Sequence, residues 1–300
     1  MDKLLIICGP TASGKSSLAI ECAKLLNTEI VCADSMTIYK GFDIGTAKVT
    51  IEESQGVKHH MLSVANSNDN FTVCDYKNMA MPIVKEIISK GKIPIICGGT
   101  GFYINSLIYE LSYGNGGPDF EIRDKYLTLA KVNGNEYVYN ILKKLDPLTA
   151  EKLHFNDIKR VVRALEIYFS GTKKSDIKDE KKLLFDVYSY SYNYEREVLY
   201  ERINKRVDLM IENGLLFEVK NLLNSGVLQS SQSMQAIGYK EICSYINGEI
   251  TLENAIDAIK QNTRRYAKRQ ITFFKKLPNL TYLTPENDEI TALNITKGLL

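Results

Sequence analysis

The first hundred positions alternate between short apolar runs and longer segments in which hydrophobic residues recur every three or four positions. Leu18, Cys22 and Leu25 follow that helical spacing, and Thr72 opens a second helical segment that extends to residue 90. Strands that alternate with helices are typical of a parallel sheet covered on both faces, so the pattern predicts an α/β fold. The apolar runs taken as strands are residues 3–8, 29–33, 59–64 and 92–97.

The pattern changes after the glycine-rich stretch "YGNGGPD" at residues 113–119. Residues 119–170 have helical spacing, and residues 182–192 form another strand-like run. Further helices are predicted for residues 195–212, 215–224, 234–246 and 252–276. We therefore predict an α/β core that is interrupted by a helical insertion and completed by the C-terminal helices. The predicted bounds are 1–112 and 151–300 for the core and 113–150 for the insertion.

The most specific motif lies between the first predicted strand and the first predicted helix, where "GPTASGKS" matches G-x-x-x-x-G-K-[ST]. Its glycines let backbone N–H groups face a phosphate, and the N-terminus of the helix adds a favourable dipole. Lys15 would reach the terminal phosphate and Ser16 would ligate Mg²⁺. The flanking strand and helix argue against a chance match, so the parallel-sheet core is predicted to be P-loop NTPase-like. The loop consists of Gly9, Pro10, Thr11, Ala12, Ser13, Gly14, Lys15 and Ser16.

Two other stretches directly follow predicted strands and are expected to meet this loop at the carboxyl edge of the sheet. Asp34, in "ADSMTIYKGFDIGTAK", would bind a metal ion or accept a proton there, or it would only cap a turn together with Ser35. The "GGTG" stretch at 98–101 permits close approach of a ligand or forms a tight turn, and it offers the Thr100 hydroxyl. The Asp34 stretch is favoured as functional because an apolar strand, an acid and a glycine-rich loop coincide there.

Basic residues gather in three predicted helices. Those at 159–163 suit a solvated, salt-bridged helix face. Arg202 and Arg206 lie four residues apart and would clamp a diphosphate or pair with neighbouring acids. Residues 260–276 contain seven basic residues and no acidic one. This basic segment is a candidate contact for nucleic acid, with a solvated helix face as the alternative.

The composition excludes some classes of protein but says little about the chemistry of this one. The 300 residues have a formal net charge of +2 and no apolar run long enough to span a membrane. The opening "KLLIIC" is too short for a signal peptide, so we expect a cytoplasmic protein, and we expect a monomer. Six cysteines without a C-x-x-C pair predict reduced thiols and no zinc site. The absence of N-K-x-D after the phosphate loop disfavours a GTPase.

Seven motifs follow one another along the chain: "GPTASGKS", "ADS", "IYKGFDIGTAK", "GGTGFY", "DPLTAEKLHFNDIKRVVRALEIYFSGT", "QAIGYKE" and "RRYAKRQITFF". Through these motifs the chain resembles the bacterial tRNA dimethylallyltransferases, from residue 5 to about residue 276. Members of that family transfer a dimethylallyl group from dimethylallyl diphosphate to N6 of adenosine 37 in the anticodon loop of tRNA. They need Mg²⁺ and release diphosphate. The resemblance implies that the anticodon stem-loop of tRNA and dimethylallyl diphosphate are the partners.

The resemblance also implies roles for individual residues. Residues 9–16 would hold the diphosphate, Lys15 and Arg206 would donate to the leaving group, and Asp34 would be the general base. The helical insertion would grip the anticodon stem-loop, and the end of the basic segment would add phosphate contacts. The residues implied to contact tRNA are Asp34, Ser35, Met36, Thr37, Thr100, Arg123, Lys159, Arg160, Val161, Val162 and Arg163.

Two positions depart from the family pattern, and three other functions stay open. Phe155 stands where proline is usual, and Met36–Thr37 stand where glutamine is common, which affects loop geometry rather than chemistry. The phosphate loop and Asp34 alone would also suit a P-loop kinase of a nucleoside or small metabolite. The loop and the basic segment would suit a nucleotide-gated RNA-binding module. Prenyl transfer to free adenine nucleotides is disfavoured because it requires neither the insertion nor the basic segment.

Overall fold

The computed structural model describes residues 1–111, 119–177 and 182–299. The chain divides into two compact units. The core unit consists of Met1–Ile108 and Leu183–Leu300, and the insertion unit is Tyr109–Lys182. The predicted boundary at residue 113 falls on a stretch that lies mostly outside the described residues.

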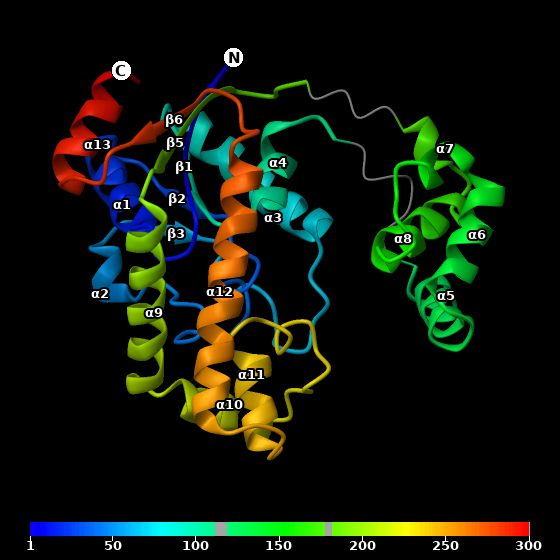
Figure 1. The fold of residues 1–300 in the computed structure, drawn as a ribbon. Helices are drawn as coiled ribbons and strands as arrows, with labels where there is room; N and C mark the ends of the chain where they lie inside the picture. The colour runs from blue at the N-terminus through cyan, green and yellow to red at the C-terminus, as the bar shows by residue number, and fades with distance from the viewer. Residues whose placement is uncertain (112–118, 178–181, 300) are drawn as a thin grey trace. The chain divides into compact units, whose positions relative to one another are not determined.

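A six-stranded, all-parallel sheet forms the centre of the core unit, in the order β3-β2-β4-β1-β5-β6 (Figure 1). The predicted α/β class is confirmed, although β3 is shorter than the apolar run at 59–64. The sequence pattern did not predict β6, because this edge strand has no continuous apolar run and is partly exposed. The strands are β1 (Lys3–Cys8), β2 (Ile30–Cys32), β3 (His59–His60), β4 (Ile95–Gly98), β5 (Asp186–Tyr192) and β6 (Leu280–Leu283).

Helices cover the sheet on both sides: α1 (Lys15–Leu25) and α13 (Asp288–Lys297) on one, α3 (Val73–Ser89) and α4 (Gly101–Ile108) on the other (Figure 1). Thr72 begins α3 as predicted, because its hydroxyl accepts a hydrogen bond from the backbone N–H of Asp75 in a capping box. Neither α4 nor α13 was predicted from the pattern, and neither was the single-turn helix α2 (Ile51–Ser54).

A helical region continues from the sheet at the carboxyl ends of its strands. The long helices α9 (Arg196–Glu212) and α12 (Leu252–Phe274) pack side by side and lead to α10 (Leu215–Asn224) and α11 (Tyr239–Ile246) (Figure 1). Ile38, Tyr39 and Phe42 pack into the hydrophobic cluster of these helices. Helix α11 begins later than predicted, since Gly238 precedes it with a φ of 99°.

The insertion unit is helical and has its own hydrophobic core. Tyr126, Val138, Leu142 and Leu165 are buried in that core. The predicted insertion ended at residue 150, whereas the unit continues to Lys182 because α8 packs against α5 and α6. The helices of this unit are α5 (Phe120–Asn133), α6 (Asn135–Leu145), α7 (Pro147–Ala150) and α8 (Ile158–Phe169), followed by the 3-10 turn η1 (Lys174–Asp176).

No helix in the described ranges is both long enough and apolar enough to cross a membrane. All six cysteines are free thiols, and five of them are buried.

Candidate active site

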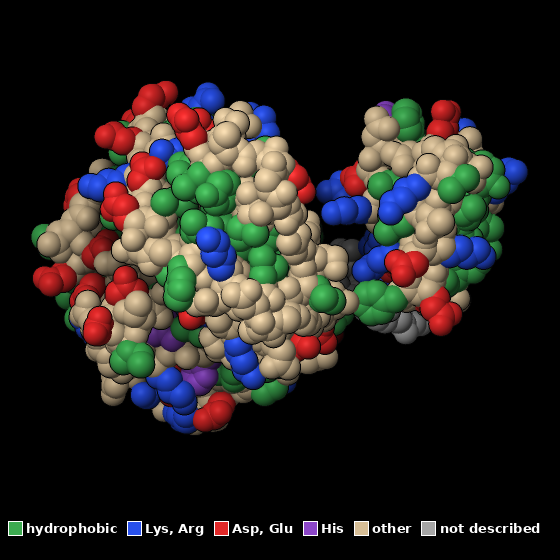
Figure 2. Space-filling model, turned by 90° about the horizontal axis from the view of Figure 1, so that it is seen from below, with side chains coloured by type: hydrophobic (Ala, Val, Ile, Leu, Met, Phe, Trp, Pro, Cys, Tyr) green, Lys and Arg blue, Asp and Glu red, His purple; other side chains and the backbone are tan. Residues whose placement is uncertain are grey.

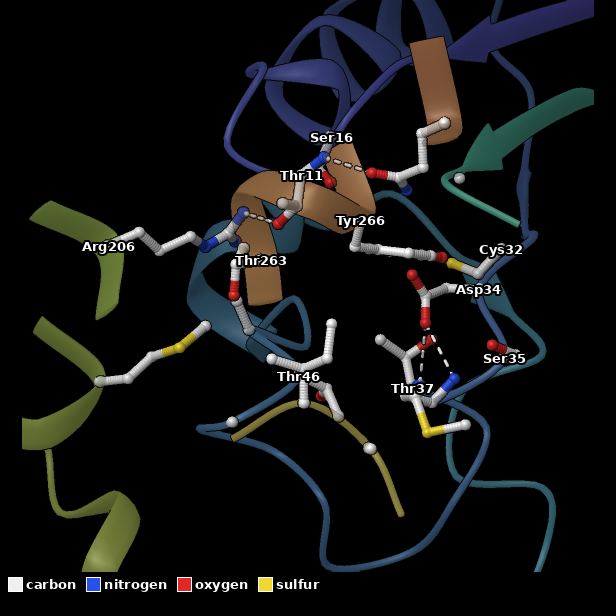
Figure 3. A pocket seen from close by; sticks show the side chains of 18 of the residues that line it. Thr11, Ser16, Cys32, Asp34, Ser35, Thr37, Thr46, Arg206, Thr263 and Tyr266 are labelled. Atoms are coloured by element: carbon white, nitrogen blue, oxygen red, sulfur yellow. Dashed lines mark hydrogen bonds between the residues drawn. The ribbon is translucent and has the colours of Figure 1, made fainter. Parts of the chain in front are cut away.

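A cavity of about 430 Å³ opens at the carboxyl edge of the sheet within the core unit (Figure 3). Thr11 from the phosphate loop, Asp34 from the end of β2 and Gly98 from the end of β4 all line it. The predicted meeting of these three stretches is therefore confirmed. Further lining comes from α9, α12, residues 45–49, His59, Leu62 and residues 232–240.

The phosphate loop has the backbone conformation of an anion-binding turn. Ala12 and Gly14 have φ values of 64° and 86°, and α1 begins directly after Gly14. Lys15 Nζ lies 3.3 Å from the carbonyl oxygen of Pro10, to which it donates a hydrogen bond. Burial lowers the pKa of Lys15, and the charge of Arg206 lowers it further, while Asp34 opposes both effects. The loop therefore combines a helix N-terminus with a poorly hydrated cation, which suits a phosphate group.

Two arginines of α9, Arg202 and Arg206, contact the phosphate loop. Arg206 Nη1 lies 3.5 Å from Thr11 Oγ1, and Arg202 Nε donates to the carbonyl oxygen of Ala12 at 2.9 Å. Burial lowers the pKa of Arg206, and nearby Asp34 counteracts that shift. Of the two alternatives for these arginines, the geometry favours the clamp beside the phosphate loop. Asp208, one of the neighbouring acids, pairs with Lys260 at 2.6 Å instead.

Asp34 caps a turn and faces the cavity at the same time. Its Oδ1 accepts hydrogen bonds from the backbone N–H groups of Met36 at 2.8 Å and Thr37 at 3.3 Å (Figure 3). The other carboxylate oxygen points toward Tyr266. The Ser35 N–H donates to Thr100 Oγ1 at 3.0 Å, which ties this turn to the loop after β4. The turn thus holds one oxygen of the carboxylate in place and leaves the second free to accept a proton.

The glycines after β4 are required by close packing. A Cβ at Gly98 would lie 2.1 Å from the carbonyl oxygen of Ala33. A Cβ at Gly99 would meet the Gln270 amide at 2.3 Å, and one at Gly101 would meet the Phe273 ring at 2.1 Å. The glycines of "GGTG" therefore let Ala33, which follows β2, and helix α12 pack directly against this backbone. The stretch is more than a tight turn.

Substitution of Gly98 tests this packing. We expect Gly98→Ala to lower the free energy of unfolding by about 3 kcal/mol, because the backbone of Ala33 is unable to move aside for the added methyl group. Urea unfolding followed by circular dichroism measures the change. Gly298→Ala is the control, since a Cβ there would meet its nearest atom at 3.5 Å, an ordinary contact. Equal stability of Gly98→Ala and the wild-type protein would contradict the packing argument.

The sequence analysis assigned no role to two residues of α12 that belong to the site. Gln270 is 5% exposed and bonds with the backbone of both the phosphate loop and the loop after β4. The Tyr266 ring lies across the cavity beside Asp34 (Figure 3), and burial raises the pKa of its hydroxyl to about 12. The sequence did contain a signal for Gln270, because an uncharged glutamine stands there at a buried position of a strongly basic helix. That signal would have identified Gln270 as a residue of the site.

The basic segment is not a uniformly charged surface. Lys260 pairs with Asp208, and Arg264 Nη1 donates to Asn204 Oδ1 at 2.6 Å, so both are directed toward α9. Positions 265, 268, 269, 275 and 276 carry exposed basic side chains. The outer face of α12 therefore stays available to a polyanion, whereas the inner face builds the cavity.

The insertion unit contains the other residues that were predicted to contact tRNA. Arg123 forms two hydrogen bonds with the Glu166 carboxylate, at 2.7 and 3.1 Å, and Arg163 Nη1 forms another at 2.7 Å. Glu166 is 2% exposed, so it fixes both guanidinium groups at the surface of α8 and α5. Lys159 and Arg160 are exposed. Lys and Arg side chains are seen over the face of this unit in Figure 2.

Two of the predicted tRNA contacts need correction. Val161 and Val162 are 0% and 2% exposed and pack in the core of the insertion unit. Their side chains are unavailable to RNA, because the helical spacing that exposes the preceding basic residues turns these two inward. They stabilise the helix that presents the basic side chains.

Oxygen donors for Mg²⁺ are present beside the phosphate loop. Within residues 1–111, 119–177 and 182–299 no group of three His, Cys, Asp or Glu side chains is arranged to hold a metal ion. Ser16 and Asp34 both line the cavity. Mg²⁺ commonly takes one or two protein oxygens and completes its shell with substrate phosphates and water, so this donor set fits Mg²⁺ bound together with a diphosphate.

Comparison with known proteins identifies similar sequences over nearly the whole chain. The family model described as IPP transferase matches residues 37–277. The tRNA dimethylallyltransferase of Acetivibrio thermocellus is 48% identical over 290 residues, which cover 95% of this chain and 93% of that protein. The tRNA dimethylallyltransferase of Caldanaerobacter subterraneus subsp. tengcongensis is 50% identical over 279 residues, 91% of this chain and 89% of that protein.

Solved structures agree with this result. The full-length tRNA isopentenylpyrophosphate transferase from Bacillus halodurans is 39% identical, with a TM-score of 0.75 and coverage of 100% of this chain and 96% of that one. A eukaryotic dimethylallyltransferase whose structures show it acting on tRNA is 31% identical, with a TM-score of 0.83, and covers 100% of this chain and 79% of that one.

Proposed function

The chain belongs to the IPP transferase family, and on this basis we propose that it is a tRNA dimethylallyltransferase. It transfers the dimethylallyl group of dimethylallyl diphosphate to N6 of adenosine 37 in the anticodon loop of tRNA. The observation that carries the proposal is one cavity in which a phosphate loop, a carboxylate and an apolar lining occur together. Val207, Met210, Ile237 and Ile259 contribute the apolar part, which suits an isoprenoid better than a nucleoside.

In the proposed reaction N6 of the adenine attacks the allylic carbon, the C–O bond to the diphosphate breaks, and one N6 proton passes to the Asp34 carboxylate. An aromatic amine is a poor nucleophile, so removal of its proton in the transition state accelerates the attack. Negative charge develops on the leaving diphosphate. Lys15 and the backbone N–H groups of the phosphate loop would stabilise that charge, while Arg206 would mainly hold the diphosphate of the bound donor.

We further propose that Ser16 holds Mg²⁺ together with the diphosphate. The bound ion would neutralise phosphate charge and favour departure of the leaving group. Asp34 would not ligate the ion, because its Oδ1 is engaged by the turn and its other oxygen is kept for the proton.

The acceptor is proposed to be the anticodon stem-loop, whose adenine must turn out of its stack to reach Asp34. Arg123, Lys159, Arg160 and Arg163 of the insertion unit are the proposed phosphate contacts, with the exposed face of α12 as a second basic surface. A single chain supplies every residue assigned to the reaction, which supports a monomer.

The test incubates the pure protein with an unmodified tRNA transcript, dimethylallyl diphosphate and Mg²⁺, and analyses the nucleosides by mass spectrometry. The proposal expects N6-dimethylallyladenosine in the tRNA with no consumption of ATP. ATP turnover without prenylation would instead identify a kinase. Modification of free AMP in preference to tRNA would identify a cytokinin-type prenyltransferase, and unmodified tRNA that is bound in a nucleotide-dependent way would identify a binding module.

Removal of Arg206 is expected to raise the KM for the donor more than it lowers the rate of the chemical step. We expect Arg206→Ala to raise the KM for dimethylallyl diphosphate about tenfold, since one charge-assisted contact contributes about 1.5–3 kcal/mol. Steady-state kinetics with varied donor and saturating tRNA measure it. Arg196→Ala is the control, because Arg196 lies on the same helix, packs over the Tyr200 ring and does not line the cavity. An unchanged donor KM would refute the role of Arg206.

A further inference from the structure

A buried hydrogen-bond bridge joins the donor side of the cavity to its acceptor side. The phosphate loop and the turn at Asp34 approach each other only across the carboxyl edge of the sheet. Gln270, on α12, lies between them and is 5% exposed. Its Oε1 accepts a hydrogen bond from the Thr11 N–H at 3.0 Å, and its Nε2 donates to the Gly99 carbonyl oxygen at 2.9 Å.

The acceptor side of this bridge continues to the general base. Gly99 is followed by Thr100, whose Oγ1 accepts from the backbone N–H of Ser35. Tyr266, four residues before Gln270 on α12, lines the same cavity beside Asp34 (Figure 3). A continuous set of contacts therefore leads from the loop proposed to hold the diphosphate to the turn that holds Asp34.

Gln270 packs tightly against the backbone that follows β4. A Cβ placed on Gly99 would lie 2.3 Å from the Gln270 amide nitrogen and 3.8 Å from Asp34 Oδ2. Each polar atom of the Gln270 side chain has a backbone partner on a different loop, so the side chain has no freedom to shift unless one loop moves with it.

We infer that Gln270 is a positioning residue, which fixes the phosphate loop relative to the Asp34 turn and so sets the distance between the allylic carbon and the attacking amine. The inference rests on the proposed function. Gln270 touches neither reacting atom and acts through Thr11 and through Gly99, the residue before Thr100. Reacting atoms must be about 3–3.5 Å apart, and a misplacement of about 1 Å costs about 100-fold in rate.

The test compares single-turnover rates of the full-length protein with both substrates saturating. Gln270→Met keeps the length of the side chain and removes both hydrogen bonds. We expect its rate of transfer to fall about 100-fold, while the KM values for donor and tRNA stay within threefold of the wild-type values. Gln261→Met is the matched control, because Gln261 is an exposed glutamine of the same helix, and its rate is expected to match the wild type.

A double-mutant cycle separates positioning from a purely structural role. Tyr266→Phe is expected to lower the rate about tenfold alone and to add little to Gln270→Met, because neighbouring residues of one site have non-additive effects. A Gln270→Met rate within threefold of the wild type, or a loss no greater than its unfolded fraction measured by thermal melting, would overturn the inference. If this variant does not fold, Gln270→Glu keeps the acceptor for Thr11 and loses the donor to Gly99. Its expected loss is about tenfold, and a wild-type rate would overturn the inference.

Failure of the inference is distinguishable from failure of the proposed function. A wild-type protein that prenylates tRNA, combined with a Gln270→Met variant of equal rate, rejects the positioning role alone. A wild-type protein that leaves tRNA unmodified rejects the proposed function and the inference with it.

Discussion

Asp34→Asn is expected to lower the rate of prenyl transfer by about 10²–10⁴-fold, the usual contribution of a general base. The asparagine oxygen can still accept the two hydrogen bonds that Asp34 Oδ1 receives from Met36 and Thr37, so the turn and the tRNA-binding surface are expected to persist. The amide is unable to take a proton from N6 of adenine at neutral pH. Single-turnover kinetics and a filter-binding assay with labelled tRNA measure the two quantities separately.

The control for this substitution is Asp257→Asn, at an exposed position of α12, for which unchanged kinetics are expected. An Asp34→Asn variant that transfers at the wild-type rate would refute the assignment of the base. An equal loss of tRNA binding would show that Asp34 contributes to the RNA interface rather than to proton transfer.

Lys15→Met is the second substitution with a large expected effect. It keeps an unbranched side chain of similar length and removes the positive charge beside the phosphate loop. We expect kcat to fall about 10²–10³-fold, because a single donor to the charge that develops in a transition state has a contribution of that size. The KM for tRNA is expected to stay within threefold of the wild type, since Lys15 serves the donor side of the cavity.

Lys24→Met controls for loss of a lysine from α1, because Lys24 is exposed and pairs with Glu21 at 2.8 Å, near the other end of the helix. Release of diphosphate, followed with a coupled assay, measures kcat for both variants. If Lys15→Met retained kcat and changed only the donor KM, then Lys15 would bind the ground state and the transition state equally. Its proposed role in departure of the leaving group would then be wrong.

The organisation of the core unit follows from local sequence patterns. The run at Lys3–Cys8, the phosphate loop and α1 are encoded within 25 consecutive residues, and each was predicted close to its observed bounds. A hydrophobic run indicates a buried strand, and glycines indicate positions with a positive φ. A few neighbouring residues therefore suffice to identify a strand, a phosphate loop and the helix that follows it. The meeting of Thr11, Asp34 and Gly98 was also predictable, because parallel strands place their carboxyl ends at one edge.

Features that depend on packing between distant segments were not predictable in this way. Val161 and Val162 were predicted to contact tRNA with the basic residues beside them, yet burial against α5 and α6 makes them part of a core. The same packing places α8 in the insertion unit, beyond the predicted end at residue 150. A short edge strand such as β6 has almost no hydrophobic signal of its own, and it forms because β5 offers an unpaired edge.

The sequence by itself determined the fold class and the phosphate loop, and it identified Asp34 as the carboxylate beside that loop. Each of these features depends only on a short run of neighbouring residues. Only the tertiary structure decided how the site is held together. The Thr11 N–H bonds to Gln270, which is 259 positions away in the chain, and Gln270 bonds to Gly99 across 171 positions. No local pattern encodes such contacts, since they exist only when α12 packs across the carboxyl edge of the folded sheet.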